Sequence, residues 1–143
     1  MKLKIILPLP PKELSPNYTV GSRGGRLGKA SKIAKYRHDS KIAGLCSMSG
    51  GEIFNWERAT IQMTFFFRDK RRRDKDNLLA SIKAAADGLQ DAGVIANDSG
   101  LTFLPVEVAV DRLRNGITLR PPALRLLARM QGLLAGRARL WRR

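Results

Sequence analysis

The sequence predicts an α+β fold in which a small mixed β-sheet packs with helices, as a single domain followed by a basic C-terminal extension. Three observations predict it. Residues 61–68 and 104–111 alternate apolar and polar side chains with the period of a half-buried β-strand. Residues 77–90 lie between them and carry apolar side chains at helical spacing. The composition changes near the end of the chain, which divides it into an expected domain at 1–120 and an expected helical extension at 121–143.

The first expected element is a strand at residues 2–7, which the proline-rich run 8–11 ends because proline lacks a backbone donor. Residues 15–29 are rich in glycine, serine and basic side chains, and they predict a mobile basic loop. Residues 30–45 predict a basic helix with a weak apolar stripe.

The second half of the domain is expected to return to the sheet. The helix at 77–90 should end before Gly93, since glycine suits the position after a helix. The turn sequence Asn-Gly at 115–116 then predicts that strands at 104–110 and 117–119 form a hairpin.

Length and charge restrict the classes of function that fit this chain. A chain of 143 residues fits one domain, and a composition of 43% hydrophobic and 27% charged residues favours a folded chain over a disordered one. The 27 Lys and Arg residues exceed the 12 Asp and Glu residues, which gives a net charge of +15. Because small soluble domains usually carry a net charge of about 2 to 8 in magnitude, we expect a polyanionic partner.

Several classes of protein are excluded by missing residues. The single cysteine, Cys46, and the single histidine, His38, leave no internal disulfide and no Cys/His zinc site, and they fit a reducing cytoplasm. No run approaches the roughly 20 apolar residues of a membrane span, so we expect no membrane partner. The sequence has no phosphate-binding Gly-x-x-x-x-Gly-Lys-Ser/Thr loop and no Gly-x-Gly-x-x-Gly run after a strand, so we expect no small-molecule cofactor.

The most informative window is residues 68–77, where six basic residues surround three acids. One interpretation is a solvated strand-to-helix turn in which Asp76 caps the helix and the arginines lie in water. The other is that Asp74 and Asp76, two residues apart in an extended segment, point to the same side and offer hard oxygen ligands to a divalent cation. The sequence leaves both interpretations open.

Asp98 is a third candidate ligand, within the sequence Asn-Asp-Ser-Gly at 97–100. This sequence is typical of a turn, so Asp98 is either an ordinary turn residue or a metal ligand. The second interpretation requires residues 93–102, at up to about 3.3 Å per residue, to lead back toward Asp74.

Basic side chains near these acids are expected to bind a nucleic-acid backbone. Lys83 follows Asp76 by two helical turns, so it either faces the same site or pairs with Asp87 on a solvated face. Phosphodiester hydrolysis needs a hydroxide, neutralised phosphoryl oxygens and a fixed geometry, which carboxylate-bound Mg²⁺ supplies. The candidate DNA-binding residues are Arg71, Arg72, Arg73, Lys75 and Lys83.

These residues resemble the RusA-type Holliday-junction resolvases, found mostly in bacteria and their phages. The resemblance covers about residues 3–119 and is carried by four short runs: Leu7-Pro8-Leu9-Pro10-Pro11, Ser15-Pro16-Asn17, Arg72-Arg73-Asp74-Lys75-Asp76-Asn77-Leu78, and Gly93 with Asn97-Asp98. It differs from the family at Ala80, where some members have the lysine, and at Asn97, where others have an acid.

The resemblance implies that Asp74, Asp76 and Asp98 bind Mg²⁺, with Mn²⁺ as an alternative, and are needed for cutting. It also implies that a helix lysine assists, for which Lys83 is the nearest match. Members of the family are small α+β homodimers whose subunits each nick one of two opposed strands of branched DNA. The implied location is the cytoplasm of a bacterial or phage-infected cell.

Two functions of different class are therefore carried forward. The first is a Mg²⁺-dependent, structure-selective endonuclease that resolves four-way DNA junctions by paired symmetric nicks in recombination and repair. The second is a non-catalytic basic nucleic-acid-binding protein of architectural or regulatory type. A metal-dependent RNase is a third alternative.

Overall fold

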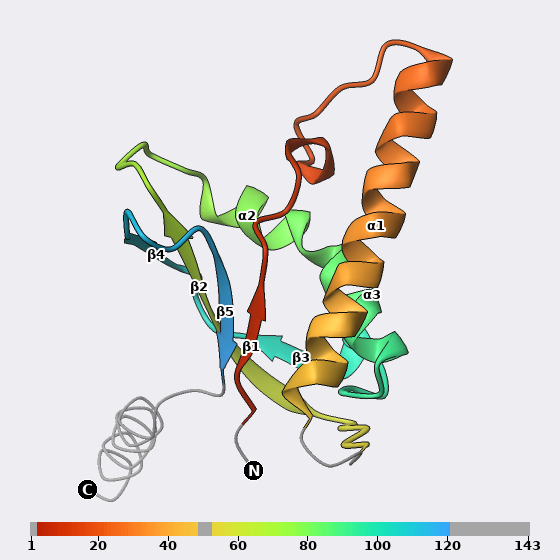
Figure 1. Cartoon of the computed structure of the whole chain (residues 1–143), viewed down its shortest axis with the longest axis vertical. Coiled ribbons are helices and arrows are strands. Elements are labelled where there is room, and N and C mark those ends of the chain that lie inside the picture. The colour runs from red at the N-terminus through yellow and green to blue at the C-terminus, as the bar shows by residue number, and fades with distance from the viewer. Residues whose placement is uncertain (1–2, 49–52, 121–143) are drawn as a thin grey trace, which may run out of the picture.

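The computed structural model describes residues 3–48 and 53–120, and it has the expected α+β fold (Figure 1). The predicted extension at 121–143 lies outside the described residues. In chain order the elements are β1 (Ile5–Leu7), the short 3-10 helix η1 (Lys12–Leu14), α1 (Arg23–Ser47), β2 (Ala59–Phe67), α2 (Lys75–Ser81), α3 (Lys83–Asp91), the 3-10 turn η3 (Asp98–Gly100), β3 (Leu101–Phe103), β4 (Glu107–Val110) and β5 (Gly116–Arg120). No helix among them is long and apolar enough to cross a membrane.

The longest strand, β2, lies at the centre of the mixed sheet. Its antiparallel neighbour is β5, with Met63 opposite Leu119, and β5 in turn pairs with β1. Along its other edge β2 pairs in parallel first with β3 and then with β4. The side chains of Met63 and Phe65 are fully buried, which explains the apolar pattern that predicted this strand.

The predicted hairpin of residues 104–110 and 117–119 is wrong, because β2 lies between β4 and β5. The chain passes from one edge of β2 to the other, so both edges of the most buried strand have hydrogen-bonding partners. The strand predicted at 104–110 is also shorter than expected. It begins at Glu107, after an interruption that contains Pro105, a residue without a backbone donor.

Helices α1 and α3 lie side by side on one side of the sheet (Figure 1). They approach closely because small residues lie between them. A Cβ atom on Gly88 would lie 2.3 Å from the backbone oxygen of Arg37, and one on Gly44 would lie 3.0 Å from Cβ of Ala92. The core beneath them includes the fully buried Phe65 and Ile117.

The helix predicted at 77–90 is present, but it is divided into α2 and α3 at the buried residue Ile82, whose backbone leaves the helical region at φ −95° and ψ 5°. Gly93 follows α3 as predicted, with φ of 75°. The N–H of Gly93 donates to the carbonyl of Gln90 and that of Val94 to the carbonyl of Leu89, which is the Schellman arrangement.

The basic loop predicted at 15–29 is shorter than expected, because α1 begins at Arg23. The Oγ of Ser22 accepts a hydrogen bond from the N–H of Gly25 at 3.1 Å and so caps the helix. This cap stabilises the first turn of α1 despite the glycines there.

Candidate functional site

The loop between β2 and α2 is held in place by Arg73. The guanidinium carbon of Arg73 lies 3.6 Å from the centre of the Phe67 ring. Its Nη2 donates to Oδ1 of Asp69 at 2.7 Å, and its Nη1 donates to the carbonyl of Arg71 at 2.9 Å. Hydrogen bonds from the Arg71 N–H and from the Arg73 side chain lower the pKa of Asp69. The guanidinium of Arg73 is therefore engaged by Phe67, Asp69 and Arg71 and stabilises the loop.

Asp74 is the N-cap of α2. Its backbone is extended, its Oδ1 accepts from the N–H of Asp76 at 2.9 Å, and its Oδ2 accepts from Nδ2 of Asn77 at 3.3 Å. The expectation that Asp76 is the cap is wrong, because the helix begins at Lys75, two residues before the predicted start. Asp74 and Asp76 accordingly do not share an extended segment, since Asp76 lies in the first turn of α2.

Asp76 is exposed, and its carboxylate has no hydrogen bond or ion pair with any described residue. Three of the candidate DNA-binding side chains, Arg71, Arg72 and Lys75, are also exposed in this stretch. Two carboxylates at the head of α2 therefore stand among cations that are open to solvent.

Lys83 is exposed as the first residue of α3. Its predicted alignment with Asp76 assumed one continuous helix, and the break at Ile82 removes the basis of that alignment. The alternative ion pair of Lys83 with Asp87 is also absent from the described residues. The other acid near the end of α3, Asp91, pairs with Arg37 of α1.

The head of α2 adjoins the N-terminal part of the chain. A pocket of about 180 Å³ is lined on one side by residues between Leu9 and Ser15 and on the other by Phe67, Asn77 and Ser81. The hydroxyl of Tyr36 donates to the carbonyl of Pro8 at 2.9 Å, close to this segment. Three of the four sequence runs that carry the family resemblance thus contribute residues to one pocket.

The pocket also brings in Lys12, an exposed lysine that the sequence analysis did not single out. The only signal for it is its position directly after Pro10-Pro11. Its proximity to α2 depends on a contact between segments about 60 residues apart, which no local pattern reveals.

Asp98 lies in η3, where Oδ1 of Asn97 accepts from the N–H of Ser99 at 3.1 Å. This turn leads directly into β3, which pairs with the first residues of β2. Asp74, by contrast, follows the last residues of β2, and a strand of nine residues is about 26 Å long. One chain therefore does not bring Asp98 together with Asp74 and Asp76. In the part of the chain that the structure describes, no group of three or more His, Cys, Asp or Glu residues is placed to hold a metal ion.

Asp74 and Asp76 still fit a magnesium ion by their chemistry. Mg²⁺ in proteins usually keeps several waters and is held by one or two carboxylates together with phosphate oxygens of the substrate. The carboxylate of Asp76 is unpartnered among the described residues, and the weaker contact of the Asp74 carboxylate is the 3.3 Å one at Oδ2.

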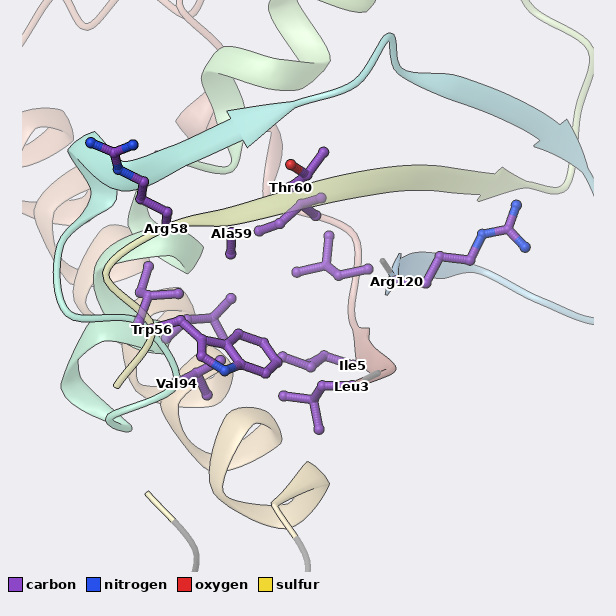
Figure 2. Close-up of a pocket in the computed structure, with 12 residues that line it drawn as sticks. Leu3, Ile5, Trp56, Arg58, Ala59, Thr60, Val94 and Arg120 are labelled. Atoms are coloured by element: carbon purple, nitrogen blue, oxygen red, sulfur yellow. The ribbon is translucent and has the colours of Figure 1, made fainter. Parts of the chain in front are cut away.

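A separate cavity of about 320 Å³ lies near the start of β2 (Figure 2). Its lining is mainly apolar and includes Leu3, Ile5 and Trp56, while Arg58 and Arg120 extend away from it. Among the residues that the structure describes, no carboxylate lines it. The candidate metal ligands and DNA-binding residues predicted from the sequence therefore lie outside this cavity.

Comparison with known proteins adds no assignment. No protein-family model matches this chain, and no curated protein matches it. The resemblance to the RusA-type resolvases stays a prediction from the residues quoted above.

Proposed function

We propose that this protein is a Mg²⁺-dependent endonuclease that resolves four-way DNA junctions by paired nicks, acting as a homodimer in the cytoplasm of a bacterial or phage-infected cell. The observation that carries the proposal is the pair of carboxylates at the head of α2. The carboxylate of Asp76 is exposed and has no partner among the described residues, yet it lies among exposed cations in a chain of net charge +15.

This arrangement is unfavourable for simple electrostatic binding of DNA, because an acid beside a phosphate repels it. A divalent cation between the carboxylates and the phosphate reverses that repulsion. When bound, Mg²⁺ supplies a hydroxide nucleophile and neutralises charge on the phosphoryl oxygens. Asp74 and Asp76 are the residues that would hold it.

The surrounding side chains take the remaining roles. Arg71, Arg72 and Lys75 bind the DNA backbone, and Arg73 holds the loop that presents them. Lys12, which lines a pocket together with residues of α2, contacts a phosphate flanking the scissile bond, and the exposed Lys83 at the start of α3 binds the DNA backbone farther away. Since one chain keeps Asp98 at the opposite end of β2, a site that uses all three aspartates takes Asp98 from a second copy.

The second candidate is a non-catalytic basic nucleic-acid-binding protein. One observation favours it: the hydrogen bond from the Asp76 N–H to Asp74 is a complete structural reason for an acid at position 74. In that candidate the carboxylate of Asp76 serves only as an acid in the first turn of α2, where the helix dipole favours negative charge.

Cleavage of an end-labelled synthetic four-way junction tests the proposal, with a linear duplex, a single strand and an RNA duplex as competing substrates. We expect symmetric nicks in two opposed strands of the junction with Mg²⁺ and none with EDTA. Tight binding without nicks under Mg²⁺ or Mn²⁺ would favour the second candidate, and preferential cutting of RNA would identify an RNase.

A further inference from the structure

The N-terminal half of α1 stands clear of the remainder of the protein. Figure 1 shows it rising beyond the sheet and the other helices, beside the chain segment that leads into it. The buried residues of this 25-residue helix, Tyr36, Ser40 and Gly44, all lie in its second half. None of the residues 23–35 is buried, and Leu27 is 66% exposed. About half of α1 therefore contributes little to the core.

This half of the helix, which we call the α1 arm (residues 23–35), is strongly basic. Between Glu13 and Asp39 the chain carries six basic residues and no acid. Lys35 pairs with Asp39, but no carboxylate of the described residues pairs with Arg23 or Lys32. The uncompensated charge of the α1 arm attracts polyanions.

Two cations of the α1 arm, Arg23 and Lys32, lie on the two sides of its exposed face, and Lys35 lies within that face. Each residue turns a helix by about 100°, so a face opposite the buried side of α1 contains Gly24, Gly28 and Ser31. Arg23 lies on one side of this face and Lys32 on the other. Between the two cations the helix surface carries these small residues together with the longer side chains of Leu27 and Lys35.

Packing within the protein does not account for the glycines on this face. A Cβ atom added at Gly24 or Gly28 would meet no atom of the described chain within 4 Å, although glycine weakens a helix relative to alanine. Arg23 and Arg26 also lie in the first turn, where the helix dipole disfavours cations, and that turn has no acid. The glycines and the cations both lower the stability of the helix here. Such a combination is typical of a surface that another molecule approaches closely.

We propose that the α1 arm enters the major groove of duplex DNA, with Arg23 and Lys32 binding the phosphates of its two walls. The proposal rests on the proposed function for its choice of DNA as the polyanion. An α-helix about 10 to 12 Å in diameter fits the major groove of B-form DNA, which is about 12 Å wide. A flat anionic membrane offers phosphates to one side of a helix only, and the major groove of A-form RNA is too narrow to admit one.

The test compares two double variants that remove equal charge. Arg23→Gln/Lys32→Gln neutralises both sides of the α1 arm, and Lys4→Gln/Arg58→Gln neutralises two exposed residues outside α1. Affinity is measured by fluorescence anisotropy at several salt concentrations, for a DNA duplex and an RNA duplex of the same sequence. All four side chains are exposed, and circular dichroism checks that each variant is folded.

We expect the arm variant to lower the salt slope for the DNA duplex by about 1.8, or about 0.9 for each lost phosphate contact, and to bind it on the order of 50-fold more weakly at about 0.1 M salt. Its affinity for the RNA duplex should change by less than a third of that factor, and the control variant should bind both duplexes nearly as the wild type does. Equal losses on DNA and RNA, or an equal loss in the control, would overturn groove entry. Arm-dependent binding to phosphatidylserine vesicles with unchanged DNA affinity would overturn it in favour of a membrane.

The test of groove entry by the α1 arm and the test of the endonuclease activity can fail independently. A wild type that binds duplex DNA through the α1 arm but never cuts a junction would overturn the endonuclease and leave the arm inference standing. Metal-dependent cutting with an arm variant that binds like the wild type would overturn the arm inference alone.

Discussion

Oδ1 of Asp74 accepts a hydrogen bond from the backbone N–H of Asp76 at 2.9 Å, so the two acids at the head of α2 are linked through the helix cap. The cap and a metal site are compatible, because a carboxylate has more than one lone pair on each oxygen. The bond fixes Asp74 relative to the first turn of α2. A cation held by both carboxylates would therefore have one ligand that is already oriented.

Substitution at Asp74 separates capping from catalysis. Asparagine caps helices as well as aspartate does, so Asp74→Asn should change the free energy of unfolding by no more than a few tenths of a kcal/mol while abolishing cleavage. Asp74→Ala should abolish cleavage and also lower stability by about 1 kcal/mol. Urea unfolding and junction cleavage measure the two effects, and cleavage by Asp74→Asn at the wild-type rate would leave the residue with capping alone.

Mixed dimers test whether Asp98 acts across subunits. Asp76→Asn and Asp98→Asn should each be inactive alone. If each site takes Asp76 from one chain and Asp98 from the other, a dimer of one Asp76→Asn and one Asp98→Asn subunit has one site in which both aspartates are intact. Mixing should therefore restore a nick in one strand. No recovery after verified subunit exchange would mean that Asp98 does not complete the site of its partner.

The close contact of α1 with α3 predicts that two glycine substitutions have very different effects on the free energy of unfolding. In Gly88→Ala the new Cβ would lie 2.3 Å from the backbone oxygen of Arg37, so the helices must move apart, and we expect a loss of roughly 1 to 3 kcal/mol. Gly28→Ala meets nothing within 4 Å and should stabilise α1 by up to about 1 kcal/mol. Similar effects in thermal unfolding would contradict the close packing at Gly88.

The stability of the protein should fall at alkaline pH because of Tyr36. Burial, followed by the charge of Asp39, raises the pKa of this phenol above its usual value of about 10. The unfolded chain ionises first, so the contribution of Tyr36 is complete below pH about 10 and is lost as the pH rises further.

Tyr36→Phe should therefore show a smaller alkaline loss, in urea unfolding at about pH 8 and about pH 11. Near neutral pH it should be about 1 kcal/mol less stable, since the bond from its hydroxyl to Pro8 is lost. Tyr18→Phe, at an exposed tyrosine, should behave like the wild type at both pH values. An alkaline loss in Tyr36→Phe as large as in the wild type would exclude Tyr36 as its cause.

Strongly periodic segments were predictable from the sequence. Met63 and Phe65 alternate with polar residues, and this pattern located β2 to within two residues at its start and one at its end. Gly93 was placed correctly because a positive φ after a helix is a local requirement. The break at Ile82 was missed because no glycine or proline marks it.

Long-range pairing was not predictable. The Asn-Gly sequence at 115–116 describes a local turn and contains no information on whether β5 pairs with β4 or inserts on the far side of β2. The position of Asp98 depends on the parallel pairing of β3 with the start of β2, and that of Lys12 on the pocket that its segment lines together with α2. The candidate carboxylates at the head of α2 were found because they are neighbours in the sequence.

The most direct test of the central claim maps the cuts made in each strand of a labelled four-way junction by the wild type, by Asp76→Asn and by Asp87→Asn in the presence of Mg²⁺. Asp87 is an acid in α3 without an ion pair among the described residues, so its substitution removes the same charge from another part of the surface. We predict symmetric nicks from the wild type and from Asp87→Asn, and none from Asp76→Asn despite junction binding at least as tight as that of the wild type. Nicks from Asp76→Asn at the wild-type rate, or no nicks from the wild type itself, would contradict the assignment of Asp76 to a metal-dependent nuclease site.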